Sequence, residues 1–141
     1  MKIIIDTCVW SLALRRNEPQ ENEYVLELKE LIKEVRVQLI GPVRQELLSG
    51  IKSRKQFNLL KEHLRAFQEL EIEIEDYELA AEYCNTARKK GIQGSNTDFL
   101  ICAISKRRKM PILTTDKDFN NFKTILPVEL HKTRAINDLT D

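Results

Sequence analysis

The sequence has few of the residues on which several common kinds of protein depend. Its three cysteines, Cys8, Cys84 and Cys102, are odd in number, far apart and without a C-x-x-C pair. This usage indicates free thiols in a reducing compartment rather than a disulfide framework. The two histidines, His63 and His131, do not have the spacing from a cysteine that a zinc site requires. With four glycines and four prolines, the chain also contains no linker of low complexity.

Net charge and long apolar runs are also missing. The 23 basic and 22 acidic residues leave a net charge of +1, so bulk charge does not indicate a nucleic-acid partner, although basic side chains can still cluster locally. Only three isoleucines separate Lys2 from Asp6, which is too few for the core of a signal peptide. No apolar run has the length of a membrane span. We therefore expect a cytoplasmic protein that does not bind membranes.

The residues that are present predict one α/β domain. A chain of 141 residues with 42% hydrophobic content can bury a sizeable core. We expect a domain over residues 1–130 and a loosely held C-terminal tail over residues 131–141. Strands are predicted over residues 2–5, 35–40, 70–76 and 111–114, with a further edge strand within 124–129. Helical spacing over 20–34 and 53–67 alternates with these strands, which predicts a central, mostly parallel sheet of four to five strands flanked by helices.

Two of the predicted strands end on carboxylates. The run KIIIDT stops at Asp6, and PILTTDKDF leads into Asp116 and then Asp118. Ligands of parallel sheets bind beyond the carboxyl ends of the strands, so these acids stand where such a fold has its site. Two more acids lie beside apolar residues: Glu46 at the border of a helical apolar stripe, and Asp98 in the first turn of an apolar helix.

Each of these acids also has a simpler explanation. Asp6 and Asp116 can cap the helices that follow them, Asp98 suits the positive end of a helix dipole, and Glu46 can be an ordinary rim residue. The four together are harder to explain in this way. Two unit charges about 4 Å apart repel by about 4 kcal/mol at an effective dielectric constant near 20, so protons or a divalent cation must compensate them. Ligands that are all oxygen favour Mg²⁺ or Mn²⁺ over zinc.

These acids belong to four segments that resemble a known family. IIIDTCVW, GPVRQEL, NTDFLICAIS and ILTTDKDF resemble the PIN-domain nucleases in order and spacing, and the first is especially similar to VapC-type toxins of prokaryotic toxin–antitoxin pairs. The resemblance spans residues 2–128. It implies a three-layer PIN-like fold, an acidic pocket for Mg²⁺ or Mn²⁺, and hydrolysis of RNA phosphodiester bonds by metal-activated water. Carried over by position, it implies that Asp6, Glu46, Asp98 and Asp116 are catalytic and that Asp6, Asp98 and Asp116 hold the metal.

Smaller groups beside these acids complete the expected site. Thr7 matches the family's hydroxyl residue after the first Asp, and Thr114 matches the hydroxyl two residues before the last acid, so both are expected to support the ligands. Asp118 is either an outer-sphere acid or a helix cap. Cys8 stands where the family often has serine, a difference that we expect to be harmless. Candidate groups for binding RNA phosphates are the basic residues Arg15, Arg16, Arg44, Lys52, Arg54, Lys55 and Arg88–Lys90.

Other functions are compatible with an α/β fold of this kind. One is a non-catalytic PIN-like scaffold or binding module, although such a domain would have no need to maintain four repelling acids. Another is a metal-dependent phosphatase-like hydrolase, but a haloacid-dehalogenase-like enzyme would have an acid where Cys8 stands. A nuclease acting on DNA is a further alternative. For a toxin, the resemblance implies a cognate antitoxin and a homodimer, and the helices near 20–33 and 53–67 offer apolar grooves for a partner helix.

Overall fold

The computed structural model describes residues 1–14 and 22–134. Three short strands, β1 (Ile3–Ile5), β2 (Val37–Gln38) and β3 (Ile112–Leu113), form one parallel sheet in the order β2-β1-β3. The helices are α1 (Thr7–Leu14), α2 (Glu23–Lys33), α3 (Gly41–Leu48), α4 (Arg54–Leu64), α5 (Ile74–Lys89), α6 (Asn96–Arg108) and α7 (Asp118–Lys123). The strands thus alternate with helices, as the sequence predicted.

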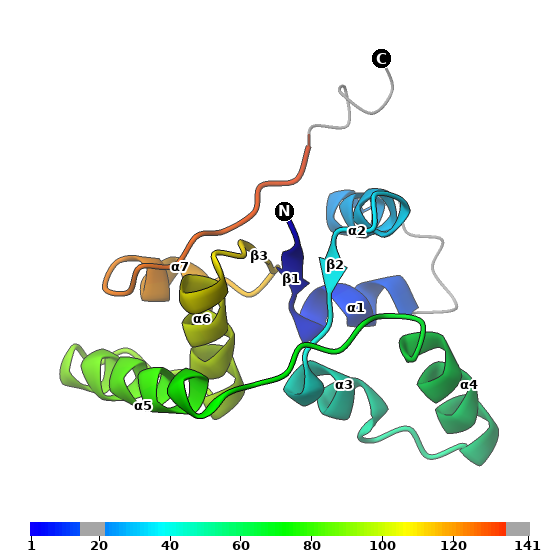
Figure 1. Ribbon diagram of the computed structural model, residues 1–141, viewed down its shortest axis with the longest axis horizontal. Helices are drawn as coiled ribbons and strands as arrows, with labels where there is room; N and C mark the ends of the chain where they lie inside the picture. The colour runs from blue at the N-terminus through cyan, green and yellow to red at the C-terminus, as the bar shows by residue number, and fades with distance from the viewer. Residues whose placement is uncertain (15–21, 135–141) are drawn as a thin grey trace.

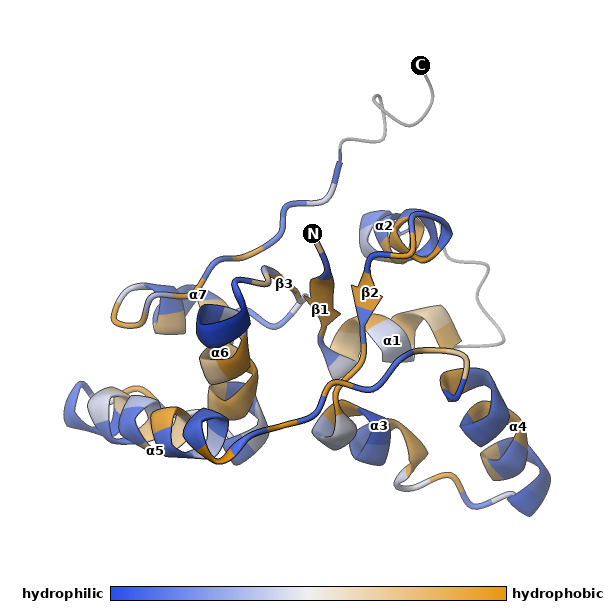
Figure 2. Ribbon diagram, in the orientation of Figure 1, coloured by the Kyte–Doolittle hydropathy of each residue, from blue (hydrophilic) through white to orange (hydrophobic). Residues whose placement is uncertain are grey.

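The sheet lies in the middle of the molecule and helices flank it (Figure 1). All three isoleucines of β1 are fully buried, because this strand has a neighbour on each side and helices around it. In Figure 1, α1 to α4 lie to the right of the sheet and α5 to α7 to its left. Strand β1 and the middle of α6 are apolar, whereas the last turn of α6 is strongly polar (Figure 2). A nearly uniform apolar helix of this kind is expected to be central, and residues 99–105 of α6 are indeed all buried.

The sheet has fewer strands than the four to five that the sequence predicted. Two further segments add a single parallel bridge each, Leu39 to Glu69 and Ile112 to Leu130, and so extend the sheet only locally. The predicted strand over 70–76 is wrong, because α5 already begins at Ile74. Of its alternating apolar residues, Leu70 and Ile72 are half-buried against the core, whereas Ile74 is 73% exposed.

A buried ion cluster explains why residues 73–76 start a helix. The carboxylate of Asp76 is fully buried and accepts a hydrogen bond from the Glu73 N–H at 2.8 Å, which caps α5. Arg107 and Arg108, at the end of α6, bind the two oxygens of Asp76 at 2.5 and 2.9 Å. Burial acts to raise the pKa of Asp76, but the N–H group and the two guanidinium groups outweigh it and hold that pKa below its ordinary value. This cluster joins the start of α5 to the end of α6.

The C-terminal segment is held more firmly than we expected. His131 and Arg134 both contact the fully buried carboxylate of Glu27 on α2, at 2.6 and 2.9 Å. The expectation of a loose tail from residue 131 is therefore wrong for residues 131–134, and residues 135–141 lie outside the described part of the chain. Among the residues that the structure describes, no helix has the length and apolar character needed to cross a membrane.

Candidate active site

Asp6 lies directly after the central strand, at the carboxyl edge of the sheet, and only 6% of it is exposed. Its Oδ1 accepts a hydrogen bond from the N–H of Thr7 at 2.8 Å. Its Oδ2 accepts from the Thr114 hydroxyl at 2.8 Å and from the Cys8 thiol at 3.5 Å. The N–H of Asp6 donates to the carbonyl of Leu113 at 3.0 Å. Backbone pairing and three donors therefore fix this carboxylate in place.

Glu46 is connected to Asp6 through Thr7. The Thr7 hydroxyl donates to Oε2 of Glu46 at 2.9 Å, while the Thr7 N–H binds Asp6. Glu46 lies on α3 and is exposed. Together with Thr97, the residue before Asp98, it lines a hollow of about 500 Å³. Glu46 thus lies on the open side of the site, and Asp6 lies on its buried side.

Asp98 is positioned by the tightly packed start of α6. The Ser95 hydroxyl accepts from the Asp98 N–H at 3.1 Å, and Oδ2 of Asp98 accepts from the Ser95 N–H at 3.0 Å. The preceding Gly94 packs closely on two aromatic rings: a Cβ added there would lie 2.6 Å from Cζ of Phe122 and 2.9 Å from Cζ of Phe99. A side chain does not fit at Gly94, so the loop that carries this cap depends on glycine.

Asp116 follows β3 and shares a hydroxyl with Asp6. Thr114 accepts from the Asp116 N–H at 3.0 Å and donates its own proton to Asp6. Oδ1 of Asp116 in turn accepts from the N–H of Asp118 at 2.9 Å, at the start of α7. The side chain of Asp116 therefore contacts the first residue of α7, and the exposed Asp118 contributes only its backbone N–H. From the sequence we expected Thr114 to support the acids, but we did not predict that this hydroxyl would contact both Asp6 and the Asp116 backbone.

The electrostatics indicate that three of the four acids lie close together. Burial raises the pKa of Asp6 above its ordinary value, and the charge of Asp116 adds to this increase. Burial also raises the pKa of Asp98, with further contributions from Asp6 and Asp116. The nearby Cys102 thiol is buried, and its pKa rises to about 12, in part through Asp98 and Asp6. Within the described residues, no basic side chain forms an ion pair with these three acids.

The donor chemistry of Asp6, Asp98 and Asp116 fits a hard divalent cation, because all their ligand atoms are carboxylate oxygens and their charges lack a cationic partner. The present side-chain conformations do not form a finished metal site. Among the described residues, no group of three His, Cys, Asp or Glu side chains is arranged to hold an ion jointly. The hydrogen bonds from the N–H groups of Ser95 and Asp118 occupy one oxygen each of Asp98 and Asp116, which leaves the second oxygen of each carboxylate for a cation.

Cys8 contributes more than the sequence indicated. Its sulfur lies 3.4 Å from the Thr114 hydroxyl and accepts from the N–H of Thr115 at 3.4 Å, in addition to its contact with Asp6. The sequence signal for this role was the position of Cys8 two residues after Asp6, because a residue there lies on the first turn of α1 beside the carboxylate. Cys8 therefore occupies the place of a small polar residue that supports Asp6 and the segment after β3.

Comparison with known proteins identifies the family. Residues 3–124 match the PIN domain. The chain belongs to the PIN domain family. This PIN domain has no match among the curated proteins. The resemblance inferred from the four acidic segments is thus confirmed at the level of family and fold.

Solved structures share the fold of this PIN domain over nearly their whole length. FitAcB from Neisseria gonorrhoeae is 24% identical, with 93% of this chain and 97% of that chain covered and a TM-score of 0.69. VapBC2 from Rickettsia felis, bound to a DNA fragment from its promoter, is 20% identical, with 93% and 98% covered and a TM-score of 0.74. VapBC-5 from Mycobacterium tuberculosis, of the VapBC family of toxin-antitoxin systems, is 19% identical, with 93% and 98% covered and a TM-score of 0.66.

Proposed function

We propose that this PIN domain is a metal-dependent endoribonuclease and the toxin of a toxin–antitoxin pair, acting in the cytoplasm. The observation that carries the proposal is the convergence of Asp6, Asp98 and Asp116 at the carboxyl edge of the sheet without a cationic partner among the described residues. PIN domains of VapC toxins are typically nucleases, and the similar folds include VapBC and FitAB proteins. A fold that brings mutually repelling acids together at the carboxyl edge of its sheet, where ligands of such folds bind, is well suited to bind a cation.

Asp6, Asp98 and Asp116 are the residues that would hold Mg²⁺ or Mn²⁺. When bound, such a cation lowers the pKa of water and stabilises the negative charge of a phosphodiester transition state. Thr7 and Thr114 orient the Asp6 carboxylate through the hydrogen bonds described above. No histidine is needed in this scheme, because carboxylates can accept the proton of the attacking water.

Glu46 stands on the open side of the acidic group, where Thr7 holds it. From the hollow that it lines, its carboxylate is placed to accept a proton from water or to contact the cation through water. Asp118 is the weaker candidate for a role in the chemistry, because it is exposed and only its backbone N–H touches Asp116. We therefore assign it to the support of α7.

A toxin requires a partner that restrains it, and one groove suits a partner helix. A hollow of about 500 Å³ lies between α1, α3 and α4 and is lined mainly by Leu14, Leu47, Ile51, Leu59 and Leu60. Leu14 and Leu59 are 42% and 47% exposed, so the groove offers apolar anchors. We propose that an antitoxin docks here on α4, one of the two helices that the sequence indicated. A homodimer is proposed on the family resemblance alone.

The test is cleavage of single-stranded and structured RNA by the purified full chain. We expect cleavage in Mg²⁺ or Mn²⁺, none in EDTA, and none for Asp6→Asn, because Asn keeps the shape of the side chain but lacks the charge that attracts the cation. A matched control is Glu78→Gln on α5, since this exposed acid lies with Lys106 and Arg107 near the opposite end of α6. The control should cleave like the wild type.

Thermal melts must show that Asp6→Asn remains folded. Equal cleavage by Asp6→Asn and wild type would refute the acidic site. Absence of any metal-dependent cleavage by the folded wild type, on RNA or on DNA, would favour the non-catalytic scaffold. Release of phosphate from small monoesters without cleavage of RNA would favour the phosphatase-like alternative.

A further inference from the structure

A further hollow, of about 580 Å³, opens beside Asp116. Its walls come from three parts of the chain: Tyr24 at the start of α2, the segment from Thr114 through α7, and the C-terminal strap, which we define as residues 130–134. Asp116 connects this hollow to the acidic site. None of the roles proposed above uses the hollow.

The charge of this hollow is the reverse of that of the acidic site. Lys117, Lys123 and Lys132 line it, whereas Asp116 is its one lining acid among the described residues. No ion pair involving these three lysines occurs in the described part of the chain. Several arginines, by contrast, are already paired, including Arg44 with Glu69 at 2.7 Å. Three unpaired ammonium groups around one hollow attract an anion.

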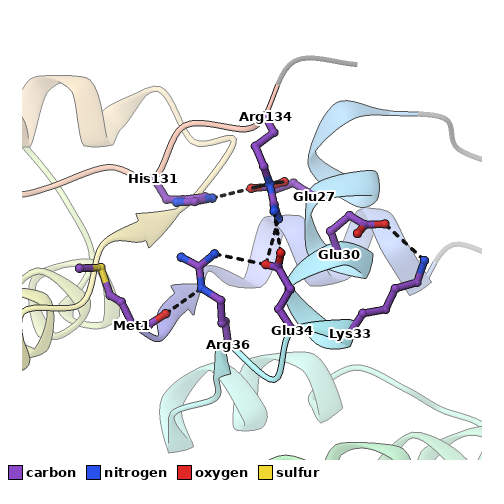
Figure 3. Close-up of polar contacts among 8 residues, drawn as sticks. All are labelled: Met1, Glu27, Glu30, Lys33, Glu34, Arg36, His131 and Arg134. Carbon is purple, nitrogen blue, oxygen red and sulfur yellow. Dashed lines mark hydrogen bonds and ion pairs between the residues drawn. The ribbon is translucent and has the colours of Figure 1, made fainter. Parts of the chain in front are cut away.

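The strap wall is fixed by a buried carboxylate (Figure 3). Glu27 on α2 is fully buried, and it binds His131 at 2.6 Å and Arg134 at 2.9 Å. Arg134 also binds Glu34 at 2.7 Å, and the two acids raise its pKa. The backbone N–H of His131 donates to the carbonyl of Ile112 at 2.7 Å, so the strap is joined to β3 as well. Lys132 is therefore carried on a wall with a defined position.

We propose that this hollow binds a nucleotide of the RNA strand next to the phosphate that is cleaved. The inference rests on the proposed nuclease function and extends it to a substrate subsite. Lys123 and Lys132 would contact the phosphate of that nucleotide, and the half-buried ring of Tyr24 offers a face on which its base can stack. The combination of cations, an aromatic ring and direct continuity with Asp116 matches single-stranded RNA better than an acidic peptide, which has no base to stack.

The experiment measures binding of a fluorescent single-stranded RNA by anisotropy in EDTA, where cleavage does not interfere. For Lys123→Gln with Lys132→Gln, we expect at least tenfold weaker binding at low salt. The slope of log affinity against log salt should become shallower by about 0.7, because both lysines contact the same phosphate and each neutralised phosphate of a single strand contributes about 0.7. Tyr24→Leu should weaken binding by about tenfold and leave the slope unchanged, since stacking is not ionic.

The matched control replaces two exposed lysines outside the hollow, Lys29→Gln with Lys106→Gln, and should bind RNA like the wild type. Equal loss in both double variants, or no loss in Lys123→Gln with Lys132→Gln, would overturn the subsite. Loss of affinity for an acidic protein partner with unchanged RNA binding would overturn it too. If the wild type cleaves RNA but the subsite variants bind RNA normally, only the subsite is overturned and the nuclease proposal stands. If the wild type binds RNA through these lysines but never cleaves it, RNA binding in the hollow stands, while the nuclease proposal and the place of this nucleotide beside a cleaved phosphate are overturned.

Discussion

Asp76 and Asp98 occupy the same position in two helices, and we predict that removing their charges changes stability in opposite directions. Each is the third residue of its helix and accepts a hydrogen bond from the residue that caps it, Glu73 at 2.8 Å and Ser95 at 3.0 Å. Asparagine retains a side-chain oxygen for that hydrogen bond. The substitutions Asp76→Asn and Asp98→Asn therefore test the charge and not the cap, and each serves as the control for the other.

The expected changes in the free energy of unfolding follow from the charged groups around each of the two acids. Asp76 is fully buried between Arg107 and Arg108, and removing one partner of a buried ion pair costs about 3–5 kcal/mol. Glu73 still pairs with both arginines, so we expect a loss at the lower end, about 3 kcal/mol. Asp98 instead faces the charges of two acids, and relief of that repulsion should exceed the ~0.3–1 kcal/mol lost at the helix dipole. We expect a net gain on the order of 1 kcal/mol.

The two effects also depend on pH with opposite sign. The pKa of Asp98 is raised, so its ionisation costs stability above its folded pKa, and this cost disappears below the ordinary value of 3.8. The gain of Asp98→Asn should therefore be present at pH 7.5 and shrink as the pH falls toward 3.8. The pKa of Asp76 is lowered, so its contribution is present above 3.8 and is lost as the pH falls through its folded pKa.

Thermal melts followed by circular dichroism in EDTA measure both effects. At pH 7.5, Asp76→Asn should melt on the order of 10 °C lower than wild type and Asp98→Asn a few degrees higher, at roughly 3–4 °C per kcal/mol for a domain of this size. Added Mg²⁺ should reduce the advantage of Asp98→Asn by stabilising the wild type. A lower melting temperature for Asp98→Asn in EDTA at pH 7.5 would refute the repulsion argument and make Asp98 a structural cap.

Two further predictions concern packing and thiol chemistry. Gly94→Ala should lose about 1–3 kcal/mol in urea unfolding, because its Cβ would overlap the rings of Phe122 and Phe99, and an unchanged midpoint would contradict this close contact. The Cys102 thiol is buried and its pKa is raised to about 12, so it should resist an aromatic disulfide reagent in the folded protein. The half-buried Cys84 should react faster. Rapid labelling of Cys102 in a folded Cys84→Ser variant would contradict the burial of Cys102.

The sequence predicted the fold best where one residue pattern had one physical explanation. The isoleucines of β1 and the apolar run of α6 could only be buried, and both are. The prediction of a strand over 70–76 failed because six residues that alternate with period two, 70–75, do not distinguish a strand from the approach to a helix. The helix forms here because Asp76 binds Arg107 and Arg108. These arginines lie more than thirty positions away in the sequence, and a local residue pattern cannot reveal such contacts.

The candidate site divides in a similar way. The order of strands and helices was enough to predict that Asp6, Asp98 and Asp116 lie near one edge. The hydroxyl of Thr114 shared by two acids, the thiol of Cys8 beside Asp6 and the strap held by Glu27 could not be predicted, because each depends on which side chains meet across the fold. The metal roles of the acids remain predictions.

The pairing of β1 with β3 has a consequence for the making of this protein. Ile4 lies beside Ile112, so the first strand leaves the ribosome long before one of its two neighbours exists. At about 5–20 residues per second, the ribosome needs on the order of 10 s to reach β3, and Asp116 follows β3. During that time the nascent chain has Asp6 but no complete acidic group. A topology that joins the first strand to one of the last thus withholds the proposed activity until translation is nearly finished.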